Sequence, residues 1–184
     1  MPRVPDRMNP DDTVLLVVDV QDKLLPAIHE ADACVEQCRR MIEAAKVLGV
    51  PLLVTEQYPS GLGATCAVLR DALGGAEMFE KTAFSSCVEP LVARLRELAR
   101  PNVVVAGIET HECVQQTVLD LLRLGYTACV CADAVGSRRP LDRDMAVARM
   151  RQAGAIITTI ESVIFELTGE AATDIFRRVL RIVK

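Results

Sequence analysis

The chain has 184 residues, of which 51% are hydrophobic and 25% are charged, and its formal net charge is −4. With a mean hydropathy of +0.25, this composition is typical of one globular domain and excludes a disordered or fibrous chain. The negative charge and the small number of aromatic residues favour no nucleic-acid partner. The apolar run at residues 14–18 falls far short of the roughly 20 residues that a membrane-crossing helix needs, so no membrane partner is expected.

Residues 1–12 are predicted to be a flexible polar lead. They contain arginines and aspartates but no apolar segment of the kind that a signal peptide requires. Seven cysteines, an odd number, indicate free thiols in a reducing compartment. We therefore expect a cytoplasmic protein, and an organelle is an open alternative.

Segments rich in Val, Ile and Leu alternate with helical patterns along the rest of the chain. Strands are predicted at residues 13–20, 51–56, 78–81, 102–108, 128–133 and 155–159. Helices are predicted at residues 33–48, 87–98, 112–124, 142–152 and 172–182. The longest irregular segment, residues 57–64, follows the second strand.

This alternation predicts an α/β fold in which helices bury a parallel sheet on both faces. We expect a single three-layer αβα domain over residues 13–184, Rossmann-like, with a six-stranded and mostly parallel sheet. Ligands of such sheets bind outside the carboxyl ends of the strands. Polar residues at those ends are therefore the first candidates for function.

Two strand ends carry charged residues among apolar neighbours. Asp19 ends the first strand and is followed by Gln21, and Lys81 ends the third. A desolvated acid must be paired or functional, but an aspartate that starts a turn is an equally good interpretation. For Lys81 alone, a lysine whose stem covers apolar surface is the simpler interpretation.

Cys113 follows the fourth strand, at the start of an amphipathic helical pattern. The partial positive charge of a helix amino terminus can lower a thiol pKa from about 8.5 into the range ~3.5–7.5. Cys113 is therefore the candidate nucleophile, although a small buried core residue is the alternative. His111 is predicted to border the pocket. With only His29 and His111 in the chain and no CxxC pair, no metal site is expected.

Three segments together resemble the isochorismatase-like cysteine hydrolase family in order and spacing: residues 19–21 (DVQ), Lys81 with residues 84–85 (FS), and residues 107–113 (GIETHEC). The similarity spans residues 13–168. Residues 55–63 (TEQYPSGLG) further resemble the isochorismatase domain-containing branch of that family.

The resemblance implies a catalytic triad in which Cys113 is the nucleophile, Asp19 accepts its proton, and Lys81 holds the thiolate and the acid in register. It also implies a cis peptide bond between Ile108 and Glu109, and an oxyanion hole formed by the amides of Glu109 and Cys113. Nicotinamidase members carry metal-binding histidines after the second strand, where this chain has residues 56–58 (EQY). We therefore expect no metal and no other cofactor.

The first functional hypothesis is a hydrolase that cleaves an amide, imide or carbamoyl C–N bond of a small molecule. The predicted substrate-binding residues are Gln21, Tyr58, Leu62, Phe84 and His111. A homo-oligomer is expected from the resemblance. The main alternative is a domain with a weak or vestigial triad that binds a ligand or partner. An ester or vinyl-ether hydrolase and a redox-sensing thiol are further alternatives.

Overall fold

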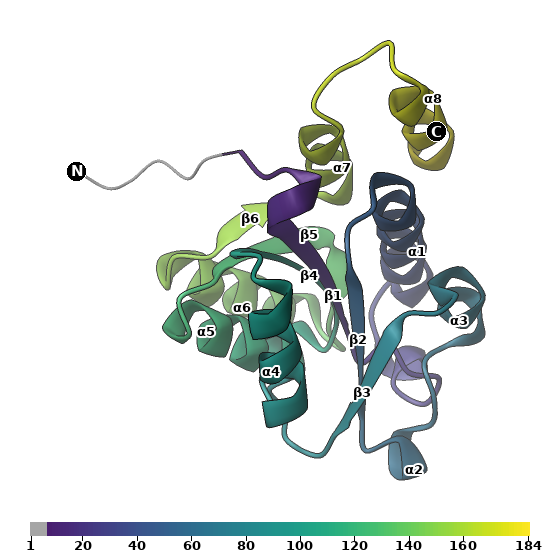
Figure 1. Ribbon diagram of the computed structural model, residues 1–184. Coiled ribbons are helices and arrows are strands. Elements are labelled where there is room, and N and C mark those ends of the chain that lie inside the picture. Colours follow the sequence, from purple (N-terminus) through teal and green to yellow (C-terminus); the bar gives the residue numbers. More distant parts are fainter. Residues whose placement is uncertain (1–6) are drawn as a thin grey trace.

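A computed structural model describes residues 7–184, and its centre is a sheet of six parallel strands in the order β3-β2-β1-β4-β5-β6 (Figure 1). Every residue of β1 is buried, as expected for a strand that is covered on both faces. The predicted α/β fold is therefore confirmed. The strands are β1 (Thr13–Val18), β2 (Leu52–Gln57), β3 (Glu77–Lys81), β4 (Asn102–Ile108), β5 (Thr127–Gly136) and β6 (Ile156–Thr158).

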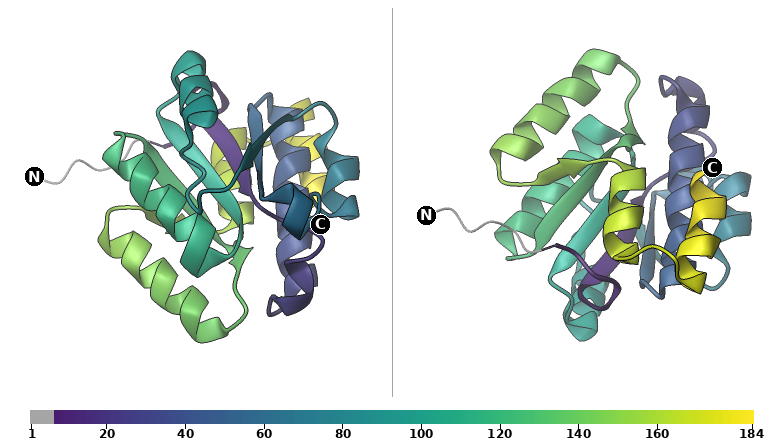
Figure 2. Two further views of the ribbon diagram at one scale, coloured as in Figure 1. Left: turned by 90° about the horizontal axis from the view of Figure 1, so that it is seen from below. Right: turned by 90° about the horizontal axis from the view of Figure 1, so that it is seen from above.

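The helices form two layers, one on each face of the sheet (Figure 2). Alternate residues of the strands point to opposite faces, which gives two separate hydrophobic clusters. The first layer packs on one cluster and consists of α1 (Ala31–Leu48), α3 (Ala67–Leu73), α7 (Ile160–Thr168) and α8 (Asp174–Val183). The second layer packs on the other and consists of α4 (Glu89–Leu98), α5 (Gln115–Arg123) and α6 (Pro140–Gln152).

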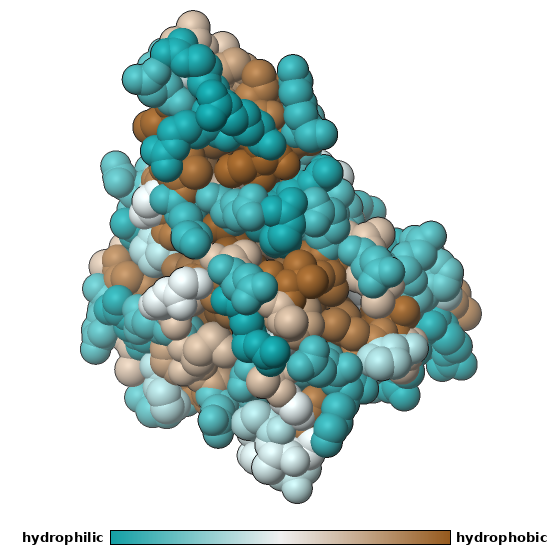
Figure 3. Space-filling view, turned by 90° about the vertical axis from the view of Figure 1, so that its right-hand side faces the viewer, coloured by the Kyte–Doolittle hydropathy of each residue, from teal (hydrophilic) through white to brown (hydrophobic). Residues whose placement is uncertain are grey.

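The face that includes α1, α3 and α8 is mostly hydrophilic, with hydrophobic patches between the polar side chains (Figure 3). Val68 on α3 and Ile175 on α8 are exposed apolar side chains. Among the residues that the structure describes, no helix is long and apolar enough to span a bilayer.

Three helices depart from the sequence prediction. Neither α3 nor α7 was expected, and the short helix α2 (Pro59–Leu62) lies within the segment predicted to be irregular. The α7 helix begins after Thr159, and the Asp133 carboxylate accepts the Ile160 amide at 2.9 Å. That contact joins segments far apart in the chain, so local sequence patterns did not indicate it.

Ordered structure also begins before the predicted boundary at residue 13. Met8 is buried in the core, and Asn9 caps a 3-10 turn at Pro10–Asp12. The apolar Met8 side chain and the hydrogen bond from its amide to Glu166 at 2.8 Å hold this segment. The part of the predicted flexible lead at residues 1–6 lies outside the described residues.

Strands β1 and β4 approach very closely at their carboxyl ends. Val18 is the register partner of Gly107, whose φ is +123°. A Cβ atom placed on Gly107 would lie 2.0 Å from the Val18 carbonyl oxygen. Glycine is therefore required here, and it brings the segment after β4 next to the segment after β1.

We expect Gly107→Ala to lower the free energy of unfolding by at least about 2 kcal/mol, because both the backbone conformation and the clash oppose a methyl group. Gly125→Ala is a matched control, since Gly125 has φ +90° but open space around its Cβ position, and it should cost only about 1 kcal/mol. Urea denaturation measures both. Equal losses would contradict the close approach.

Candidate active site

The site lies at the carboxyl ends of the parallel strands, where segments that are distant in sequence meet. Asp19 follows β1, Lys81 ends β3, and Cys113 lies in the turn after β4. The Lys81 Nζ lies 2.6 Å from Asp19 Oδ2, and both side chains are fully buried. The structure therefore brings together the acid and the lysine that the sequence singled out.

Lys81 is surrounded by oxygen atoms. In addition to Asp19, its Nζ donates to Gln57 Oε1 at 2.7 Å and to the carbonyl oxygens of Ala83 at 3.1 Å and Phe84 at 3.0 Å. A buried ion pair is tolerated only when further hydrogen bonds offset the loss of hydration. These contacts hold the ammonium group in one place and leave it no N–H for a substrate.

Sequence reasoning missed the role of Gln57. Besides accepting from Lys81, its side-chain amide donates to the Thr82 carbonyl oxygen at 2.8 Å. Gln57 thus joins the end of β2 to the segment after β3. Its position at a strand end beside Lys81 is the only signal in the sequence, and glutamine is too common there for that signal to be specific.

Cys113 lies in a π-helical turn, Thr110–Val114, immediately before α5. Its side chain is nearly buried and interacts with the Asp19 carboxylate. Burial raises the pKa of the Cys113 thiol to about 12; the Asp19 charge adds to this effect, and the nearby Lys81 charge opposes it. The expected lowering of this pKa by the helix terminus is therefore wrong.

The Cys113 thiol must lose a proton and the Asp19 carboxylate must accept one, and both groups are shielded from water. Burial also raises the pKa of Asp19, while Lys81, Thr55 and Cys113 act in the other direction. The raised thiol pKa favours a resting state with a neutral thiol beside an acceptor. A proton can pass from Cys113 to Asp19 without changing the net charge of the site.

The peptide bond between Ile108 and Glu109 is cis, at the position that the resemblance implied. The Glu109 carboxylate accepts from Arg138 Nε at 3.0 Å, and Arg138 Nη2 reaches Glu112 at 2.9 Å. Within the described residues, the Glu109 amide donates no hydrogen bond. It is therefore free to donate to a ligand, whereas the charge of Arg138 is already matched by two carboxylates.

Gln21 differs from its predicted substrate-binding role. Its side chain is fully buried, and its amide group donates to the carbonyl oxygens of Gln57 at 3.0 Å and Gly63 at 2.6 Å. Its Oε1 accepts the Gln57 amide at 2.8 Å. Both side-chain N–H groups are used, so Gln21 holds the 57–64 segment in place.

The other predicted binding residues are distributed around the site. Tyr58 and Phe84 are about half exposed, and Leu62 is partly buried. His111 Nδ1 lies 3.0 Å from the Ser137 hydroxyl. The binding roles of these four residues stay predictions.

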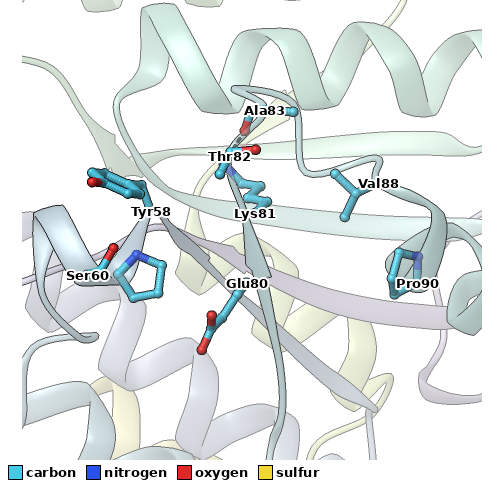
Figure 4. Close-up of a pocket in the computed structure, with 9 residues that line it drawn as sticks. Tyr58, Ser60, Glu80, Lys81, Thr82, Ala83, Val88 and Pro90 are labelled. Carbon is cyan, nitrogen blue, oxygen red and sulfur yellow. Dashed lines mark hydrogen bonds between the residues drawn. The ribbon is translucent and has the colours of Figure 1, made fainter.

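A surface cavity of about 500 Å³ opens beside Lys81. Tyr58 and Ser60 lie on one side of it, and Val88 and Pro90 on the other (Figure 4). Cys113 does not line this cavity. Within residues 7–184, no group of three or more His, Cys, Asp or Glu side chains could hold a metal ion.

The fold is that of isochorismatase-like hydrolases. A model of the isochorismatase domain matches residues 13–162, and this chain therefore belongs to the isochorismatase family. It is 38% identical over 180 residues to isochorismatase family protein 1B from Dictyostelium discoideum, covering 95% of this chain and 87% of that protein. Across the curated relatives, the share of their length that this chain covers ranges from 62% to 89%.

Two solved structures are similar over almost the whole chain. The structure described as MAR1 ribonuclease from Caenorhabditis elegans has a TM-score of 0.93 and 41% identity, covering 97% of this chain and 92% of that one. YcaC from Pseudomonas aeruginosa has a TM-score of 0.91 and 25% identity, covering 98% and 92%, and its structure contains covalent acrylamide.

We expect Gln57→Leu to lower the free energy of unfolding by about 2–3 kcal/mol, because it removes an acceptor from a buried charge. Gln152→Leu is the control: Gln152 is exposed at the end of α6, and surface changes of this kind stay within about 0.5 kcal/mol. Chemical denaturation compares the two variants. Similar stabilities would mean that Gln57 does not support Lys81.

Proposed function

We propose that this chain is a cysteine-type hydrolase that cleaves an amide, imide or carbamoyl C–N bond of a small molecule. The observation that carries the proposal is the buried ion pair of Asp19 and Lys81 at 2.6 Å, which lies near the Cys113 thiol. A weak nucleophile needs an adjacent base, and Asp19 is the base. Lys81 keeps that base charged and in place.

The reaction begins when Cys113 Sγ attacks the substrate carbonyl carbon and its proton moves to Asp19. The tetrahedral intermediate collapses, the C–N bond breaks, and Asp19 returns the proton to the leaving nitrogen. A thioester is left on Cys113. A water molecule then gives a proton to Asp19 and attacks the thioester. The C–S bond breaks, the acid is released, and Asp19 returns the proton to Cys113 Sγ.

The developing negative oxygen needs hydrogen-bond donors. The amides of Glu109 and Cys113 are the proposed oxyanion hole, and the absence of another hydrogen bond from the Glu109 amide among the described residues supports this role. One such donor is worth roughly 2.7–4 kcal/mol in the barrier.

The charges near Cys113 favour a small substrate without negative charge. Glu112 is partly exposed and acts on the Cys113 thiol, and Arg138 is already paired with Glu109 and Glu112. RNA cleavage, the activity in the description of the Caenorhabditis elegans relative, is less well supported here. The chain's net charge of −4 opposes the binding of a polyanion.

The covalent acrylamide in the Pseudomonas aeruginosa relative indicates a reactive nucleophile in that protein, because nucleophiles add to the vinyl carbon of acrylamide and leave its amide bond intact. An alternative, a ligand-binding module with a vestigial triad, is favoured by a different observation. Cys113 is only 5% exposed, and its pKa is raised to about 12. Turnover separates the two functions.

We expect the full chain to release ammonia or amine from members of a panel of small amides, imides and carbamoyl compounds. Cys113→Ala should reduce that release at least about a thousandfold, because the nucleophile is lost. Cys87→Ala, which removes a cysteine outside the triad, should retain activity. Binding without turnover would support the alternative module, and cleavage of an RNA oligonucleotide in the same assay would overturn the small-molecule proposal.

We also infer a homo-oligomer, because α6 exposes Leu141 and Met145 one helical turn apart, at 68% and 59%. Contiguous exposed apolar patches mark protein–protein contacts. Size-exclusion chromatography with light scattering should give a mass that is a multiple of 20.1 kDa. A single-chain mass at micromolar concentration would overturn this inference. The cytoplasmic location stays a prediction.

A further inference from the structure

A network of buried hydrogen bonds connects the Asp19 carboxylate to the Cys113 backbone by a route that does not include Lys81. Thr55 on β2 donates to Asp19 Oδ1 at 2.8 Å, and its hydroxyl lies 3.2 Å from the Ser86 hydroxyl. The Ser86 amide donates to Thr117 Oγ1 at 2.8 Å. The Thr117 hydroxyl, on α5, then donates to the Cys113 carbonyl oxygen at 2.6 Å.

None of the three hydroxyl-bearing side chains is accessible to solvent. Thr55, Ser86 and Thr117 are all 0% exposed, so none of them contacts bulk water. Burying a hydroxyl is costly unless it is hydrogen-bonded. The three hydroxyl groups come from β2, from α5 and from the segment that precedes α4. The hydrogen-bond network therefore depends on the tertiary fold.

The direction of these hydrogen bonds follows from the number of protons. An ionised carboxylate only accepts, so the single Thr55 hydroxyl proton points to Asp19. In the 3.2 Å contact, Ser86 must therefore be the donor and Thr55 the acceptor. A hydrogen bond to an ionised carboxylate is stronger than one to a neutral carboxyl group, so the Thr55 contact favours the charged form of Asp19.

We propose that Thr55 is a positioning residue that keeps the Asp19 carboxylate charged and turned toward Cys113, with Ser86 fixing the direction in which Thr55 donates. This inference rests on the proposed function, in which Asp19 is the base. Thr55 binds Oδ1 while Lys81 binds Oδ2, so rotation of the carboxylate would break both contacts. Thr55 acts through Asp19 and contacts no reacting atom.

The groups that face Asp19 define its pH dependence. Lys81 approaches from β3 and Cys113 from the turn after β4, and Glu112 acts more remotely through Cys113. The Thr55 hydrogen bond lowers the pKa of Asp19 against the effect of burial. Removing it must raise that pKa, so the base becomes protonated, and ineffective, at a higher pH.

The test is the rate at which iodoacetamide alkylates Cys113 in the full chain between pH 4 and 9, followed by peptide mass spectrometry. In this reaction the Sγ–C bond forms, iodide leaves, and the thiol proton goes to Asp19. The wild-type rate should fall on the acid side as Asp19 becomes protonated. Cys87, partly exposed and with a pKa near 11, is the internal reference in every sample.

We expect Thr55→Val, which has nearly the same shape without the hydroxyl, to move the acid midpoint up by about 1 pH unit. One pH unit corresponds to a tenfold change in the acid dissociation constant of Asp19, which is near the lower end of the range for a hydrogen bond to a charged group. Thr55→Ser should restore the wild-type midpoint. Ser86→Ala should move it in the same direction by less, and this variant carries the test if Thr55→Val does not fold.

Asp19→Asn separates the two possible failures. Asp19→Asn should show no titration step on the acid side, and its alkylation rate should rise steadily with pH. If the wild type gives the same profile, then Asp19 is not the base and both proposals are overturned. If the wild type has the midpoint but Thr55→Val and Ser86→Ala have profiles that coincide with it, only the role of Thr55 is overturned. A purely structural role would change stability but not this midpoint.

Discussion

The ion pair between Lys81 and Asp19 is the interaction on which the site depends. Two charges with fully buried side chains lose several kcal/mol of hydration each, and their attraction offsets that loss only if the remaining donors and acceptors are satisfied. The surrounding structure meets this condition. Gln57 and two carbonyl groups surround the ammonium, and Thr55 binds the other carboxylate oxygen. The 57–64 segment is anchored by Gln21 to the same region, so loop conformation and charge placement are linked.

Sequence patterns predicted the sheet because β1, β2, β4 and β6 are rich in Val, Ile and Leu. They also located Asp19, Lys81 and Cys113, since charged residues and a cysteine stand out where apolar strands end. The residues that support them did not stand out. These are ordinary polar residues, namely Thr55, Gln57 and Ser86. Their importance comes from contacts with residues that lie 24 to 36 positions away in the chain. Helix α7 was missed for a similar reason, because its start is bound by Asp133 from β5.

The Cys113 thiol shows why a local argument can give the wrong sign. Its position beside a helix start predicted a lowered pKa, but the closing of the fold around it removes water and places a carboxylate next to it. Desolvation is the larger effect. A neutral thiol beside a charged base is protected from adventitious oxidation. It becomes a nucleophile only when its proton moves to the base during attack on a substrate.

The π-helical turn at Thr110–Val114 has a consequence for how the family can change by insertion and deletion. In a helical segment each added residue rotates everything beyond it by about 100°. A single insertion between Glu109 and Cys113 would turn the Cys113 side chain away from Asp19, and it would also rotate the buried face of α5 relative to the sheet. This segment can therefore vary in residue type much more freely than in length, and its length is a marker of whether a related chain has kept the geometry of the site.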